Sequence, residues 1–126
     1  MSKISYANLK IKTDNKTESF DFNGNKIEVL QYLPIDDKYS LINITLQKAR
    51  EKNIYNPVKL DLYFHLNIIY MYTNLNFTEK QREDEAKLYD TLLSNGIIEK
   101  VIDLIPECEY DDLYNYLTDI KDEILT

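Results

Sequence analysis

The sequence predicts a single α+β domain, in which an N-terminal β-hairpin precedes a bundle of four to five helices. Early in the chain, FDFNGNKIEV places alternating apolar residues on both sides of an Asn-Gly pair, which is typical of a hairpin. Beyond Pro34 the apolar residues recur at spacings of three and four, which favours helices. The 126 residues are enough to bury one core. We therefore assign residues 1–126 to one domain, with a hairpin region over 1–34 and a helical region over 35–126.

The hairpin is expected within residues 19–33. Phe20 and Phe22 alternate with polar residues before the pair Asn23-Gly24, which suits the positive φ angles of a type I′ turn. Residues 2–13 alternate more loosely and are a candidate third strand.

The first helix is expected after Pro34, with Asp36 as its N-cap. Four residues on its predicted inner face repeat at spacings of three and four: Tyr39, Ile42, Leu46 and Ala49.

The second helix should begin at Asn56-Pro57, where Asn caps and Pro occupies the first turn. Residues 57–75 are apolar nearly all round. A helix of this kind is covered by its neighbours, so we expect it at the centre of the core.

The remaining helices follow from local signals. Thr78 and Gln81 form a capping box that opens a third helix. Gly96 closes that helix as a left-handed cap, a short helix follows, and Pro106 starts the last one.

The last helix, residues 107–126, carries an apolar seam with acids on its other faces. The seam repeats at spacings of three and four, as two heptads do: Tyr110, Leu113, Leu117, Ile120 and Ile124. It can pack on the core of the same chain, as most amphipathic helices do. Alternatively, these five residues bind a partner protein.

The net charge is concentrated at one end. Residues 99–126 contain nine acids and two lysines, which give −7, whereas the first 98 residues are neutral overall. Such a block is typical of an interaction surface or a solvated face. Negative charge argues against direct nucleic-acid binding and against anionic membranes, because both require cations on the protein.

Catalytic and metal-binding patterns are not expected. His65 is the only histidine, lies in the most apolar segment, and is best explained as a satisfied core or boundary residue. With two glycines there is no phosphate-binding loop, and no acidic run has the spacing of a calcium or zinc site. We predict a protein that is not an enzyme and that needs no cofactor or metal.

Composition indicates the setting. Asn, Ile, Lys and Tyr dominate the chain, as in proteins encoded by a low-GC bacterial or phage genome. No apolar run is long enough for a membrane span or a signal peptide. Cys108, the only cysteine, agrees with a reducing compartment. We expect the protein in the cytoplasm of the bacterial host.

Three stretches carry a resemblance: FDFNGNKIEVLQYLPIDDKYSLI, NIYNPVKLDLYFHLNIIYMYTNLNFTEKQ and KLYDTLLSNGIIEKVIDLIP. Together they resemble small acidic proteins from structural gene clusters of tailed phages of low-GC Gram-positive bacteria. The layout is similar to that of phage tail assembly chaperones, which open with an N-G-K hairpin; here Asn25 separates the turn from Lys26. The resemblance implies binding without catalysis, with a tape-measure or other tail protein as partner.

Three functions are therefore considered. The first is a non-enzymatic phage morphogenesis factor that covers an aggregation-prone helix of a tail protein. The second is an acidic inhibitor that imitates nucleic acid and occupies a basic groove of a host defence protein. The third is a minor virion structural component. A homo-oligomer is compatible with each.

Overall fold

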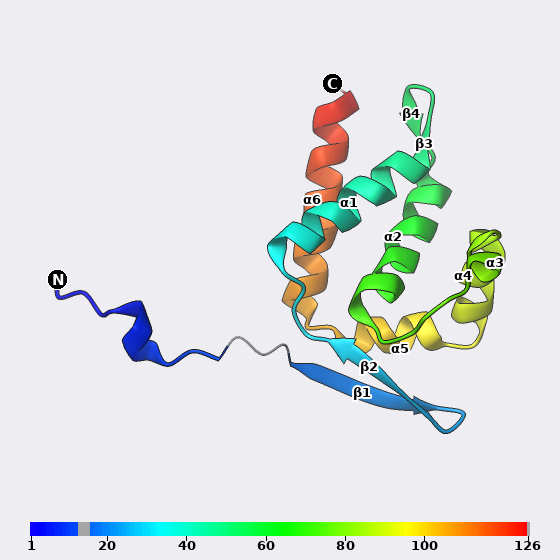
Figure 1. The fold of residues 1–126 in the computed structure, drawn as a ribbon. Helices are drawn as coiled ribbons and strands as arrows, with labels where there is room; N and C mark the ends of the chain where they lie inside the picture. Colours follow the sequence, from blue (N-terminus) through cyan, green and yellow to red (C-terminus); the bar gives the residue numbers. More distant parts are fainter. Residues whose placement is uncertain (13–15, 126) are drawn as a thin grey trace.

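The structure, a computed structural model, describes residues 1–12 and 16–125, with side chains up to residue 123. A β-hairpin lies across one end of a helical body, and an N-terminal arm of residues 1–12 extends away from it (Figure 1). The predicted α+β class, with an N-terminal hairpin ahead of a mostly helical region, is confirmed.

The hairpin consists of β1 (Thr17–Phe22) and β2 (Asn25–Leu30), paired antiparallel. Phe22 pairs with Asn25, so Asn23 and Gly24 form the two-residue turn, with φ of 50° and 81°. Two positive φ angles are what a type I′ turn requires, and the sequence prediction is confirmed. Alternate residues of β2, including Ile27 and Val29, are buried against the helices.

The candidate third strand over residues 2–13 is wrong for residues 2–12, and Thr13 lies outside the described residues. Instead, a short 3₁₀ helix, η1 (Tyr6–Leu9), forms there without a buried residue. The outer edge of β2 is taken by another segment: Val29 forms an isolated bridge with Thr73. Residues 1–12 therefore do not pair with β2 as a third strand.

The helix α1 (Ile35–Ala49) packs along α2 (Pro57–Tyr72). Of the predicted inner face, Ile42, Leu46 and Ala49 are buried, but Tyr39 is 64% exposed. Asp36 does not cap α1, because the helix begins at Ile35 and Pro34 occupies the N-cap. The prediction placed the start of the helix slightly too late.

The start of α2 is as predicted. The side chain of Asn56 accepts hydrogen bonds from the backbone N–H groups of Val58 and Lys59, at 2.9 and 3.2 Å. Pro57 is the first helical residue. A small hairpin that the sequence did not predict, β3 (Arg50–Glu51) with β4 (Ile54–Tyr55), connects α1 to α2. The second half of α2 supplies the centre of the core: Phe64, Leu66, Ile68, Ile69 and Tyr72.

The predicted third helix is divided into two. The capping box of Thr78 and Gln81 is present, but it opens only the short α3 (Glu79–Arg82). Asp84 then accepts a bond from the N–H of Lys87 and caps α4 (Glu85–Ser94). This break brings the described part of the chain to six helices, where four to five were expected.

The last two helices complete the body. Gly96, with φ of 75°, lies between α4 and α5 (Ile97–Leu104), as predicted. Pro106 precedes α6 (Glu107–Leu125), which crosses α1 (Figure 1).

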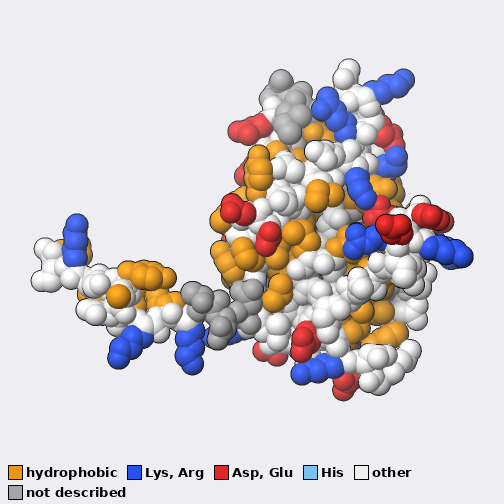
Figure 2. All heavy atoms as spheres, in the orientation of Figure 1, with side chains coloured by type: hydrophobic (Ala, Val, Ile, Leu, Met, Phe, Trp, Pro, Cys, Tyr) orange, Lys and Arg blue, Asp and Glu red, His pale blue; other side chains and the backbone are white. Residues whose placement is uncertain are grey.

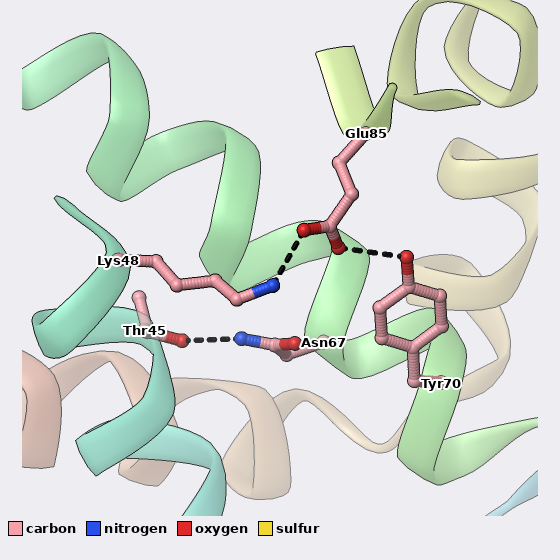
Figure 3. A network of polar contacts seen from close by, with 5 residues as sticks. All are labelled: Thr45, Lys48, Asn67, Tyr70 and Glu85. Atoms are coloured by element: carbon pink, nitrogen blue, oxygen red, sulfur yellow. Dashed lines mark hydrogen bonds and ion pairs between the residues drawn. The ribbon is translucent and has the colours of Figure 1, made fainter. Parts of the chain in front are cut away.

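A polar network joins α1, α2 and α4 at the side of the bundle (Figure 3). Glu85 pairs with Lys48 and accepts a hydrogen bond of 2.9 Å from the hydroxyl of Tyr70. Nearby, Asn67 donates to Thr45 at 3.0 Å. Each of these side chains has a protein partner, which is the expected condition of polar groups inside a fold.

Candidate functional site

The five residues of the predicted seam do not share one surface. Leu113 and Leu117 are 0% and 6% exposed and belong to the main core. They therefore cannot contact a partner in this conformation, and for these two residues the core alternative is the correct one. Tyr110 and Ile120 are half-buried against that core. The side chain of Ile124 lies outside the described residues.

A groove runs between α1 and α6, beside the buried seam. Its volume is about 270 Å³ and its walls are mostly apolar, formed by Ile35, Lys38, Tyr39, Ile42, Tyr116 and Ile120. Tyr39 and Tyr116 are 64% and 41% exposed. Ile42 and Ile120 are in contact with the core, whereas Ile35, Tyr39 and Tyr116 are exposed, so the groove has an apolar base and exposed aromatic rings at its sides. We call it the α1–α6 groove.

A buried ion pair joins the two helices that form the groove. Lys38 Nζ on α1 lies 2.6 Å from Glu109 Oε1 on α6, and both side chains are 5% exposed. Glu109 Oε2 accepts a 2.8 Å hydrogen bond from the backbone N–H of Leu33. The ring of Tyr32 covers the ammonium, with Nζ 3.8 Å from its centroid. One carboxylate thus holds α6 to both α1 and the segment before it.

Beneath the same ion pair, Tyr72 is completely buried. Burial raises the pKa of its hydroxyl, and the nearby negative charge of Glu109 raises this pKa further. Within the described residues the Tyr72 hydroxyl makes no hydrogen bond of standard geometry, although the Glu109 carboxylate lies close enough to raise its pKa. The hydroxyl stays protonated and neutral beside the carboxylate.

Acids border the groove on the solvent side. Asp112 and Asp119 lie three or four residues from Tyr116 on α6, and Asp36 lies three residues before Tyr39 on α1. Residues at these spacings are neighbours on a helix surface. All three carboxylates are exposed. The groove therefore combines an apolar floor with a negative rim, which suits a ligand that is apolar and basic.

A second depression, of about 260 Å³, lies on the other side of α6 and includes His65. Its Nδ1 lies 2.8 Å from the carbonyl oxygen of Asp61, and its Nε2 lies 2.9 Å from the Tyr110 hydroxyl. The prediction of a satisfied histidine is confirmed, since both ring nitrogens have partners. Burial raises the pKa of Tyr110, and the charge of Asp61 adds to this effect.

This His65 cluster has the geometry of a link between α2 and α6. Among the described residues, the one hydroxyl bound to the ring is that of Tyr110, and its raised pKa disfavours the phenolate that a nucleophile would need. The Phe64 ring packs edge-on against both His65 and Tyr110, with centroids 5.4 and 5.8 Å away. The arrangement supports packing of the two helices.

Two further kinds of site were considered for the described residues. Among them, no group of three or more His, Cys, Asp or Glu side chains is arranged to hold a metal ion. Within the same part of the chain, no helix is long and apolar enough to cross a membrane. Cys108 is an exposed thiol.

Comparisons with known proteins identify no relative. No family model matches the chain, and searches of curated proteins and of solved structures found no match. Function is therefore inferred from the geometry of the chain itself.

The sequence prediction missed most of the groove. Only Ile120 was among the expected partner-binding residues, and Tyr39 was assigned to the core. Tyr116 lies one position from the seam residue Leu117, so its exposure follows from helical geometry once the seam is placed inside. The pairing of α1 with α6, which creates the groove, leaves no local signal in the sequence.

Proposed function

We propose that this protein is a non-enzymatic phage morphogenesis factor of the tail-assembly-chaperone type, which binds a tape-measure or other tail protein. The α1–α6 groove is the observation that carries the proposal. It exposes Tyr39 and Tyr116 beside Ile42 and Ile120, which contact the core, and exposed aromatic rings in a depression are typical of protein-binding sites. The resemblance to phage structural-cluster proteins supplies the class of partner.

In this mechanism the groove receives the apolar face of a helix from the tail protein. Helix-in-groove binding buries apolar residues at spacings of three and four, and thereby prevents them from aggregating. The acidic rim, including Asp112 and Asp119, adds selectivity for basic helices and keeps the complex soluble. The proposed partner contacts therefore lie on the face of α6 next to the buried Leu113 and Leu117, and not on these two residues.

The test is co-expression with the tape-measure protein encoded nearby. We expect a soluble complex that is lost in the double variant Tyr39→Ser/Tyr116→Ser. The matched control is Ile54→Ser/Val58→Ser, which removes two exposed side chains that lie away from the groove. The control should retain the complex.

Four results would contradict the proposal. If no complex forms, or if both double variants bind equally, the groove is not the client site. If affinity for a host defence protein is found and collapses in salt, the nucleic-acid-mimicking inhibitor is favoured, because screening weakens contacts between exposed charges. Presence in purified particles would favour a minor virion component.

A further inference from the structure

The N-terminal arm is the most exposed apolar segment of the described chain. Four of its large apolar side chains are between 53% and 75% exposed: Ile4, Tyr6, Leu9 and Ile11. Its recorded backbone hydrogen bonds are local, from Asn8 to Ser5 and from Lys10 to Ala7. The body of the same chain therefore leaves the arm uncovered.

The arm is also basic, whereas the rest of the chain taken together is acidic. Residues 1–12 contain three lysines and no acid, whereas residues 17–126 contain 21 acids and 11 bases. Figure 2 shows hydrophobic and basic side chains but no acidic ones on the arm, set apart from a body that displays acids among its hydrophobic patches. An apolar, basic segment and an apolar groove with an acidic rim are complementary.

We propose that the arm of one copy lies in the α1–α6 groove of a second copy, so that two chains exchange arms and form a dimer. The length permits this, because 12 extended residues span at most about 40 Å. The 19 residues of α6 extend over about 28 Å. Reciprocal exchange covers eight large apolar side chains of the arms in two grooves and leaves neither groove open, as a closed two-fold dimer requires.

The specific contacts follow from charge and shape. Leu9 and Ile11 bring apolar side chains to Tyr39 and Tyr116, while the neighbouring lysines of the arm face the acidic rim. A tail-protein helix competes for the same groove if the proposed function holds. The exchange itself needs no client, so its test is independent of that function.

Sedimentation equilibrium of the full chain, without any tail protein, is the first experiment. We expect a dimer whose dissociation constant rises at least tenfold in Lys10→Glu/Lys12→Glu and in Tyr39→Ser/Tyr116→Ser. Ile54→Ser/Val58→Ser is the matched control and should dimerise as the wild type does. At a concentration low enough for every chain to be monomeric, thermal unfolding of each variant should match that of the wild type, since the substituted side chains are exposed in the single chain.

Site-specific cross-linking is the second experiment. Two chains that lack the native thiol through Cys108→Ser are mixed, one carrying Leu9→Cys and the other Tyr116→Cys. We expect an inter-chain disulfide under mild oxidation, and none when Ile54→Cys replaces Tyr116→Cys.

Each other outcome overturns the proposal. A monomer at about 100 μM, where a standard-size interface would be occupied, shows that the arms are not exchanged. A dimer that persists after deletion of residues 2–12 shows that another surface joins the copies. Equal cross-linking of Leu9→Cys to Tyr116→Cys and to Ile54→Cys shows that the arm does not bind specifically in the groove.

Discussion

The buried ion pair between Lys38 and Glu109 should contribute to stability only as an intact unit. Both side chains are 5% exposed, and Glu109 also accepts the backbone N–H of Leu33. Removing one member of such a pair leaves the other charge buried without a partner, which costs about 3–5 kcal/mol. We therefore expect Lys38→Met and Glu109→Ala each to lose about this much, a large part of the roughly 5–15 kcal/mol that holds a domain folded.

The double variant Lys38→Met/Glu109→Gln separates pairing from packing. Methionine fills the lysine volume without a charge, and the carbonyl of glutamine can still accept the Leu33 N–H. Replacement of a whole buried pair is often nearly neutral, so we expect the double variant to unfold within about 1 kcal/mol of the wild type. The control is Glu51→Gln, which breaks the exposed pair with Lys59 and should change stability little.

The assay is urea denaturation followed by circular dichroism, analysed as a double-mutant cycle in which Lys38→Met and Glu109→Gln are the two single variants. A double variant as unstable as the sum of its single variants would refute the reasoning, because it would show that the two side chains act independently. A Glu109→Ala variant close to wild type would refute the burial of the pair itself.

Three further predictions concern the core, a helix cap and pH. Leu113→Ala should lower the free energy of unfolding by about 2–5 kcal/mol in the same assay, because it leaves a cavity in the core. A change near zero would show that the Leu113 side chain is not buried. Asn56→Ala should cost about 1 kcal/mol through loss of the α2 cap, and unchanged unfolding would contradict the two bonds seen there. Burial raises the pKa of the Tyr70 and Tyr72 hydroxyls above the ordinary value, so the folded state favours the protonated phenols. Their contribution to the free energy of unfolding is therefore complete below about pH 10, where an unfolded tyrosine is still protonated, and is lost as the pH rises above it. Urea midpoints should fall between pH 8 and 11.5, and a folded-state phenolate absorbance that reaches the amplitude of all 11 tyrosines in this range would contradict the burial.

The features that the sequence predicted correctly are local. The Asn23-Gly24 turn, the cap of α2 and the box of Thr78 with Gln81 each depend on residues within four positions of one another. Short-range hydrogen bonds and φ preferences determine such features before any tertiary contact forms. For the same reason they were visible in the sequence alone.

The features that were missed depend on pairs far apart in the chain. Glu109 belongs to the acidic block, which suggests a solvated face, yet its partner Lys38 lies 71 positions earlier and draws it into the interior. Tyr39 repeats with core residues along α1 but faces α6 at the edge of the groove. A single sequence gives no sign of which helices meet, so hydrophobic periodicity could not predict the position of either residue.

The two faces of α6 decide which experiments on function are informative. Leu113 and Leu117 hold α6 to the core, so substitutions there destabilise the fold and reduce binding of any kind. Tyr116 belongs to the same helix but is exposed, so its substitution changes the groove while the fold is preserved. Loss of client binding in a Tyr116 variant with normal unfolding would therefore assign the partner surface to the groove. Loss confined to variants of the buried seam would reflect unfolding alone.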